Sequence, residues 1–260
     1  MDENKIQKPL ILVTNDDGIT APGIRALIKV MNEFGEVVVV APDGPQSGMG
    51  HAITLNAALR CDKIVVDDGP QEEYSCSGTP VDCVKLAVNK ILRRKPDLCV
   101  SGINHGSNSS INVIYSGTMS AALEGALEGV PSIGFSLLDH AHEADFAAAQ
   151  EVVRKLATHA LAEGIAEGCC LNVNIPKLKW NEIKGIRICR QANANWIEEF
   201  DERKDPMGRT YYWLTGTFEN YDHGLDTDEW ALANGYVSVV PVQYDLTAHH
   251  RISILNKWTL

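Results

Sequence analysis

Two adjacent carboxylates, Asp16 and Asp17, directly follow a short apolar run over residues 10–14. Such a run is typical of a buried strand, and ligands in open α/β sheets bind beyond the carboxyl ends of the strands. Adjacent carboxylates repel each other, and a hard divalent cation relieves that repulsion. Oxygen donors favour Mg²⁺ or Mn²⁺, and also Ca²⁺ under crystal conditions. An isolated Asp-Asp-Gly sequence is, however, more often only a turn before a helix.

Further polar side chains follow two other predicted strands. Ser47 lies in a loop rich in Gly, Pro and Ser, and Asn104 and Asn108 follow a strand predicted over residues 98–103. Ser47 and Asn104 offer neutral oxygen ligands, and Asn108 could donate a hydrogen bond to a phosphate oxygen. Each segment alone resembles an ordinary surface loop. Because the carboxyl ends of parallel strands meet at one edge of a sheet, we expect these side chains near Asp17.

A helix start supplies the fourth polar segment. Ser116, Gly117 and Thr118 open a helix predicted over residues 119–128, and the free backbone N–H groups of such a start form a ready anion site. The same residue types are equally typical of an ordinary helix cap. The convergence of all four segments at one edge of the sheet predicts a site that holds a metal ion and a phosphate group.

The elements that must position these residues alternate between strand and helix patterns. Strands are predicted over residues 10–14, 37–40, 98–103 and 133–137. The first predicted helix is capped by Thr20 and ends at Gly35. The second, over residues 79–92, begins with a capping box formed by Thr79 and Asp82. Two more helices are predicted over residues 119–128 and 143–163. Short, fully apolar strands joined by helices predict an α/β fold with a mostly parallel sheet and helices on both faces.

The pattern changes after about residue 175. Longer strands are predicted over residues 183–191 and 211–218, with a polar, charged stretch between them and several aromatic side chains nearby. We expect a smaller β-rich C-terminal appendage in the form of an extended hairpin. The tail beyond Asp245 is amphipathic and is expected to pack on another surface, for example on a second subunit.

Composition excludes several classes of protein. A length of 260 residues fits one domain, or one domain with an appendage, and a net charge of -11 argues against a nucleic-acid polymer as the main partner. No apolar run reaches the roughly 18 residues of a membrane span, and residues 1–10 lack the pattern of a signal peptide. Seven cysteines without paired spacing are typical of reduced thiols, which predicts a cytoplasmic protein.

Five ordered segments of this chain resemble the SurE family, the stationary-phase survival 5'-nucleotidases. The resemblance runs over roughly residues 10 to 137 and continues more loosely toward the C-terminus. The matching segments are Val13-Thr14-Asn15-Asp16-Asp17-Gly18, Ala41-Pro42 through Ser47-Gly48, Ser77-Gly78-Thr79-Pro80, Ser101 through Asn108, and Tyr115-Ser116-Gly117-Thr118.

The resemblance implies a Rossmann-like core, one divalent metal ion per subunit, and hydrolysis of nucleoside 5'-monophosphates to nucleoside and phosphate. It places the metal ligands at Asp16, Asp17, Ser47 and Asn104. It also implies a homodimer or homotetramer that exchanges C-terminal elements. We therefore expect a catalytic core over residues 1–176 and an oligomerisation region over 177–260 that packs with the core and is not an independent domain.

The clustered ligands suggest a mechanism in which water, activated by the cation, attacks phosphorus. We assign catalytic roles to Asp16, which would orient or deprotonate that water, and to Asn108. Asn108, the Ser116 and Thr118 hydroxyls and the amides from Gly117 onward would stabilise the developing charge. His105 fits either a general acid or a surface residue. The preferred base, and a preference for 3'-monophosphates or short polyphosphates, stay open.

Two other functions compete with this one. A phosphatase with an aspartyl-phosphate nucleophile usually carries Asp-x-Asp, whereas side chains of adjacent residues in an extended segment point to opposite sides. A nucleotide-binding module without catalysis could use the same sheet edge. Paired acids argue against that module, and no Gly-x-x-x-x-Gly-Lys-[Ser/Thr] phosphate loop is present.

Overall fold

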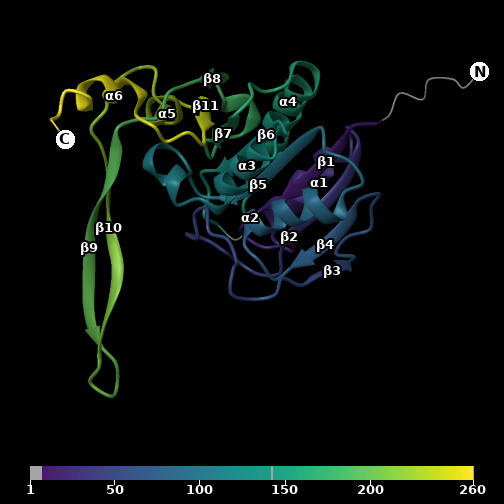
Figure 1. The fold of residues 1–260 in the computed structure, drawn as a ribbon, viewed down its shortest axis with the longest axis horizontal. Coiled ribbons are helices and arrows are strands. Elements are labelled where there is room, and N and C mark those ends of the chain that lie inside the picture. Colours follow the sequence, from purple (N-terminus) through teal and green to yellow (C-terminus); the bar gives the residue numbers. More distant parts are fainter. Residues whose placement is uncertain (1–7, 142, 260) are drawn as a thin grey trace, which may run out of the picture.

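A nine-stranded sheet forms the centre of the molecule, which is described here from a computed structural model over residues 8–141 and 143–259. Its strand order is β3-β4-β2-β1-β5-β6-β7-β11-β8 (Figure 1). The strands are β1 (Leu10–Thr14), β2 (Glu36–Pro42), β3 (Cys61–Ile64), β4 (Glu72–Cys76), β5 (Leu98–His105), β6 (Ser132–Leu137), β7 (Cys169–Ile175), β8 (Ile186–Ile188) and β11 (Val237–Gln243).

The middle of this sheet is parallel. Strands β4, β2, β1, β5, β6 and β7 pair with their neighbours in parallel, and only β3 and β11 form antiparallel pairs with them. From β1 the chain goes to β2 and β4 on one side, and then crosses to β5, β6 and β7 on the other. The order in which successive strands are added therefore reverses between the parallel strands β1 and β5, which is where ligands bind in such sheets.

Helices cover both faces of the sheet, which confirms the predicted α/β fold (Figure 1). On one face α1 (Pro22–Met31) packs against β1, β2 and β5, and α4 (Ala147–Glu163) packs against α1 and β5. On the other face α2 (Pro80–Leu86) packs against β1 and β2, and α3 (Gly117–Leu127) against β5, β6 and β7. The remaining helical segments are η1 (Ala87–Ile91), η2 (Ser110–Ile114), η3 (Trp180–Glu182), α5 (Asp228–Ala233) and α6 (His249–Leu255).

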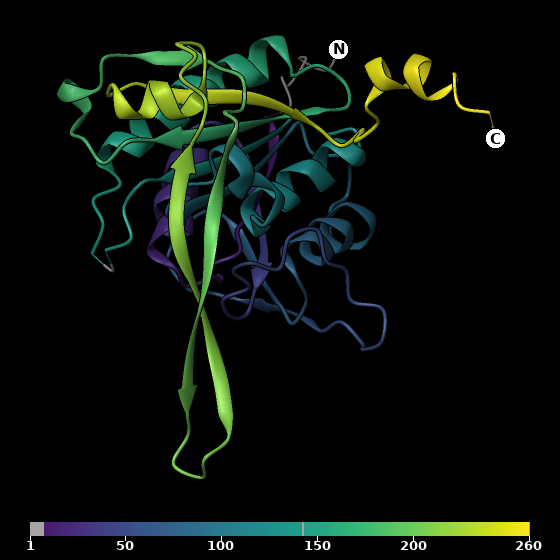
Figure 2. The ribbon, with the colours of Figure 1, turned by 90° about the vertical axis from the view of Figure 1, so that its left-hand side faces the viewer.

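A long two-stranded hairpin projects from this body (Figures 1 and 2). It consists of β9 (Ala194–Lys204) and β10 (Thr210–Asn220), which pair only with each other. The predicted appendage is confirmed as a hairpin, but the predicted strands are wrong in extent. The strand expected over residues 183–191 is only the short β8, and the polar stretch after it is β9 itself. Both faces of β9 are largely exposed, so its sequence lacks the apolar alternation that marks a half-buried strand.

Several local predictions also need correction. Thr20 does not cap α1: the N-cap residue is Ala21, whose side chain accepts no hydrogen bond, and the helix ends at Met31. Gly35 is not the end of this helix. It allows the backbone to approach Pro9 closely, because a Cβ at position 35 would lie 2.1 Å from the Pro9 carbonyl oxygen. The capping box from Thr79 to Asp82 is confirmed. Strands β4 and β7 contain too many polar residues to be predicted from apolar runs.

Two further observations concern the ends of the chain. The prediction that residues 1–10 form no signal peptide falls mostly on residues 1–7, which lie outside the described residues. Across the described helices, none is both long enough and apolar enough to cross a bilayer. Strands β8 and β11, from the region 177–260, continue the same sheet as the N-terminal strands.

Candidate active site

The sheet brings Asp16 and Asp17 beside the end of β5. Strands β1 and β5 pair in register up to Thr14 and Ser101, so the two carboxylates lie level with the last residues of β5. The backbone N–H of His105 donates to the Asp17 Oδ2 atom at 3.4 Å, and Asn104 immediately precedes it. Asp17 and Asn104, which are 87 positions apart in sequence, therefore lie at one edge of the sheet, as predicted.

The start of α3 lies against Asp16. The Thr118 hydroxyl donates to the Asp16 Oδ1 atom at 2.5 Å, and Ser116 caps the helix by accepting from the Met119 N–H at 3.0 Å. Gly117 makes this approach feasible, because a Cβ at this position would lie 2.7 Å from Asp16 Cβ and 2.8 Å from Asp16 Oδ2. The predicted helix start is thus in direct contact with the first carboxylate.

Both carboxylates are held in a costly electrostatic environment. Asp16 is only 4% exposed, and burial raises its pKa from 3.8 to about 6, helped by the charge of Asp17 and opposed by hydrogen bonds from Thr118. Burial also raises the pKa of Asp17, against the hydrogen bond from the His105 N–H. Among the described residues, no Lys or Arg forms an ion pair with either carboxylate. A divalent cation would supply the missing positive charge.

The loop that carries Ser47 is tied to the same edge. The Gln46 N–H donates to the Asp16 carbonyl oxygen at 2.7 Å, and the Gly50 N–H donates to the Tyr115 carbonyl oxygen at 3.2 Å. The loop therefore bridges the end of β1 and the start of α3, with Ser47 exposed between the two anchors. Ser47 therefore directly follows the residue whose N–H donates to the Asp16 carbonyl oxygen.

The donor set suits a hard cation better than zinc. Across the described parts of the chain, no group of three or more His, Cys, Asp or Glu side chains could hold a metal ion. The predicted ligands are instead two carboxylates, one hydroxyl and one amide oxygen, a set that favours Mg²⁺ or Mn²⁺. The Asn104 amide nitrogen donates to the Gly106 carbonyl oxygen at 3.0 Å, and no described residue donates to its Oδ1 atom.

Asn108 is fixed by polar residues of two neighbouring strands. Its side-chain nitrogen donates to Ser136 Oγ at 2.7 Å, its backbone N–H donates to Asn174 Oδ1 at 2.8 Å, and its carbonyl oxygen accepts from Asn172 Nδ2 at 2.8 Å. The amide group of Asn108 keeps a second hydrogen that could reach a ligand. The side chain is therefore held in one orientation before any substrate arrives.

Ser136, Asn172 and Asn174 are residues that sequence reasoning missed. All three are buried in β6 and β7, and Asn174 also donates to the Asn172 side chain at 2.9 Å. Two asparagines separated by one residue in a buried strand point to the same face, and buried amides need partners. That spacing was the available signal, although nothing in it identifies Asn108 as the partner.

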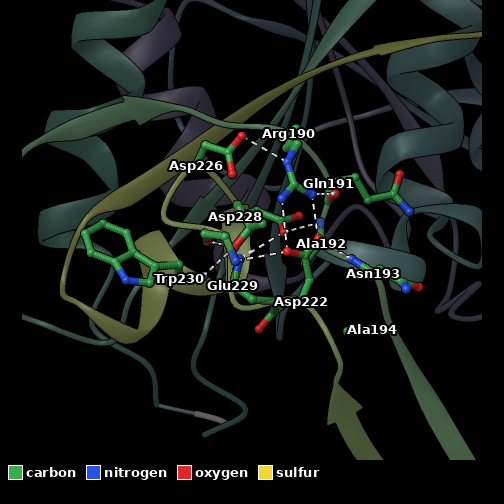
Figure 3. A network of polar contacts seen from close by, with 12 residues as sticks. Arg190, Gln191, Ala192, Asn193, Ala194, Asp222, Asp226, Asp228, Glu229 and Trp230 are labelled. Atoms are coloured by element: carbon green, nitrogen blue, oxygen red, sulfur yellow. Dashed lines mark hydrogen bonds and ion pairs between the residues drawn. The ribbon is translucent and has the colours of Figure 1, made fainter.

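A second missed cluster lies behind the loop from Asn108 to Ser116, at the foot of the hairpin. Arg190 pairs with Asp222 at 2.5 Å and with Asp226 at 3.0 Å, and Asp228 lies next to them (Figure 3). Asp228 accepts from the Ala192 N–H at 2.9 Å. Asp228 also accepts from the Ser110 N–H at 2.7 Å, and so connects the foot of the hairpin to the segment that precedes α3.

The sequence profile described as "Survival protein SurE" matches residues 11–198, which is most of the chain. The chain belongs to the SurE family. A protein of Flavobacterium psychrophilum named 5'-nucleotidase SurE is 66% identical over 98% of this chain and 99% of its own length. One of the same name from Bacteroides fragilis is 51% identical over 99% of this chain and 100% of its own length.

The SurE fold is also shared with a solved structure. The crystal structure of the SurE protein from Aquifex aeolicus superposes with a TM-score of 0.83 at 41% identity, over 95% of this chain and 98% of that one. The likeness covers nearly the whole chain, and so extends well beyond the parallel core.

Proposed function

We propose that this SurE family member is a phosphomonoesterase that hydrolyses nucleoside 5'-monophosphates to nucleoside and phosphate, with a divalent cation. The observation that carries the proposal is the contact between the buried carboxylate of Asp16, which has a second carboxylate next to it, and the start of α3, at the point where the strand order reverses. Relatives named 5'-nucleotidase SurE that are 66% and 51% identical support the same substrate class.

The residues present fit a divalent cation. Asp16, Asp17, Ser47 and Asn104 would hold it, since they come from three segments that meet at one edge, and burial, with the charge of Asp17 as a lesser cause, raises the pKa of Asp16. Mg²⁺ and Mn²⁺ both suit these donors. When bound, such an ion supplies Lewis-acid stabilisation of phosphate oxygens and lowers the pKa of water.

The protein groups around that position have separable roles. Asp16 orients the attacking water and accepts its proton, since it is the carboxylate that lies against the start of α3. The hydroxyl of Thr118 is committed to Asp16, so we assign Thr118 to positioning Asp16 more than to direct phosphate contact. Asn108, the Ser116 hydroxyl hydrogen and the Gly117 N–H are the donors left for the phosphate oxygens.

Phosphate release tests the proposal. The purified chain should release phosphate from AMP in Mn²⁺ or Mg²⁺, lose this activity after exhaustive treatment with EDTA, and regain it when the cation is restored. Saturable AMP binding without release would favour a nucleotide-binding module. Full activity in EDTA would rule out metal dependence, and a covalent aspartyl adduct trapped with a fluoride analogue would favour the aspartyl-phosphate mechanism.

We further infer that the chain forms a homo-oligomer through its hairpin. Large apolar side chains are exposed along β9 and β10, and such a concentration on one projecting element is typical of an interaction surface. They are Trp196, Ile197, Phe200, Tyr211, Tyr212, Trp213 and Leu214, with Met207 exposed in the turn between the strands. Replacement of residues 195–219 by a short Gly-Ser turn should lower the mass in solution to that of a smaller species, measured by light scattering; an unchanged mass would refute this.

We also propose a cytoplasmic location, since all seven cysteines in the described residues are free thiols, which a reducing compartment preserves. Targeting of a fluorescent fusion in the native host would test this.

A further inference from the structure

Ser110 has an unusual backbone for a residue with a side chain. Its φ angle is 51°, the only positive value outside glycine in the described part of the chain, and its side chain is fully buried. For an L-residue the left-handed conformation is roughly 5 to 30 times less populated than the right-handed one. Ser110 lies between Asn108 and Ser116, so the backbone there helps to set the spacing of two proposed phosphate donors.

Asp228 holds Ser110 in this conformation. The Ser110 N–H donates to Asp228 Oδ2 at 2.7 Å, while Asp228 Oδ1 accepts from the N–H groups of Ala192 and Glu229, each at 2.9 Å. The Asp228 carboxylate is fully buried and accepts three hydrogen bonds from backbone N–H groups. Among the described residues, no Lys, Arg or His side chain forms an ion pair with it. Hydrogen bonds to a charged acceptor are about twice as strong as neutral ones.

The Ser110 hydroxyl adds to the same arrangement by donating to the Ala192 carbonyl oxygen at 2.9 Å. Figure 3 shows Ala192 and Asp228 side by side at the foot of the hairpin. Just before Ser110, the Ser109 hydroxyl donates to Glu229 Oε1 at 2.5 Å. The start of α5 therefore contacts two consecutive residues of the loop that follows Asn108.

We propose that Asp228 is a positioning residue for the phosphate-binding loop: it stabilises the left-handed conformation of Ser110 and so fixes Asn108 and Ser116 relative to Asp16. Asp228 itself is not expected to touch the substrate. This inference rests on the proposed phosphatase activity.

Asp228→Asn tests this role with little change in volume. Asparagine replaces one of the two carboxylate oxygens by an NH2 group, which donates and cannot accept. Either the Ser110 N–H or the Ala192 N–H therefore loses its acceptor. We expect kcat/KM for AMP to fall roughly 10-fold and the inhibition constant of inorganic phosphate to rise. If Asp228 had only a structural role, the substitution would lower the melting temperature. At assay temperatures well below that melting temperature, kcat/KM and the inhibition constant of phosphate would then stay unchanged.

Rescue separates positioning from general damage. Glycine adopts positive φ without penalty, so Ser110→Gly in the Asp228→Asn background should recover kcat/KM at least threefold. Ser110→Ala removes the same hydroxyl but keeps the backbone penalty, so it should not rescue. Arg190→Gln, which disturbs the foot of the hairpin without touching Ser110, should keep kcat/KM within threefold. Failure of the glycine rescue, or equal rescue by alanine, would overturn the proposal.

Amide hydrogen exchange provides a readout without catalysis. Peptides over residues 106–116 should exchange faster in Asp228→Asn and return toward the wild-type rate in the glycine double variant. If the wild-type chain releases no phosphate, the proposed function fails while this exchange experiment still tests the loop. Unchanged exchange in Asp228→Asn would refute the positioning role whatever the activity.

Discussion

Gly117→Ala should disable the active site while leaving the fold intact. The new Cβ would lie 2.7 Å from Asp16 Cβ and 2.8 Å from Asp16 Oδ2, whereas ordinary contacts begin at 3.4 Å. Asp16 must therefore move by about 0.7 Å, and displacements of about 1 Å at a reacting group cost roughly 100-fold in rate. We expect kcat/KM for AMP to fall roughly 10- to 100-fold.

Stability should change little in the same variant. The φ angle at position 117 is not positive, so alanine fits the backbone there and stabilises the fold by up to about 1 kcal/mol through the lower entropy of the unfolded chain, which offsets part of the contact strain. Gly44→Ala is the matched control, because a Cβ at Gly44 meets nothing within 4 Å. Steady-state phosphate release and thermal unfolding measure both effects. An alanine variant at 117 with activity within twofold of wild type would refute the assignment of Asp16 to the reaction.

Substitutions at three other positions have defined outcomes. Because burial raises the pKa of Asp16 from 3.8 to about 6, its ionised form destabilises the fold, and stability of the metal-free protein should fall as pH rises between these values. Asp16→Asn should thus raise the free energy of unfolding in EDTA near pH 7 by up to about 3 kcal/mol, and with it the melting temperature. Near pH 4 the substitution should change neither. Thr118→Val should lower kcat/KM roughly 10-fold, whereas Thr118→Ser should stay within threefold, because serine keeps the hydroxyl that donates to Asp16. Gly23→Ala should destabilise the protein by about 3 kcal/mol in denaturant unfolding, since its Cβ would lie 1.9 Å from the Ile103 carbonyl oxygen.

The geometry that parallel sheets impose explains which parts of the site could be predicted. Asp17 follows β1 and Asn104 lies at the end of β5, and parallel strands end at a common edge whatever the rest of the chain does. Ser116 is recognisable as a helix cap from its residue type and the helix behind it. These residues could be placed together before any coordinates existed, because each signal is local and the sheet supplies the rest.

The supporting contacts could not be predicted, because their partners are distant in sequence and have no shared pattern. Asn108 and Asn174 are 66 positions apart, and Ser110 and Asp228 are 118 positions apart. A serine residue type also gives no sign that its φ angle will be positive. The hairpin strand β9 could not be predicted for a different reason: a strand without a buried face has no alternation of apolar and polar residues to detect.

Two energetically costly features lie on the same edge of the sheet: the buried carboxylate of Asp16 and the left-handed backbone of Ser110. Neither would persist unless other residues enforced it, and both have such support, from Thr118 and from Asp228. Costs of this kind gather where a site must be organised before its ligand arrives. Removal of the buried carboxylate in Asp16→Asn should therefore stabilise the metal-free protein and slow the reaction, whereas relief of strain elsewhere in the fold should leave the reaction rate unchanged.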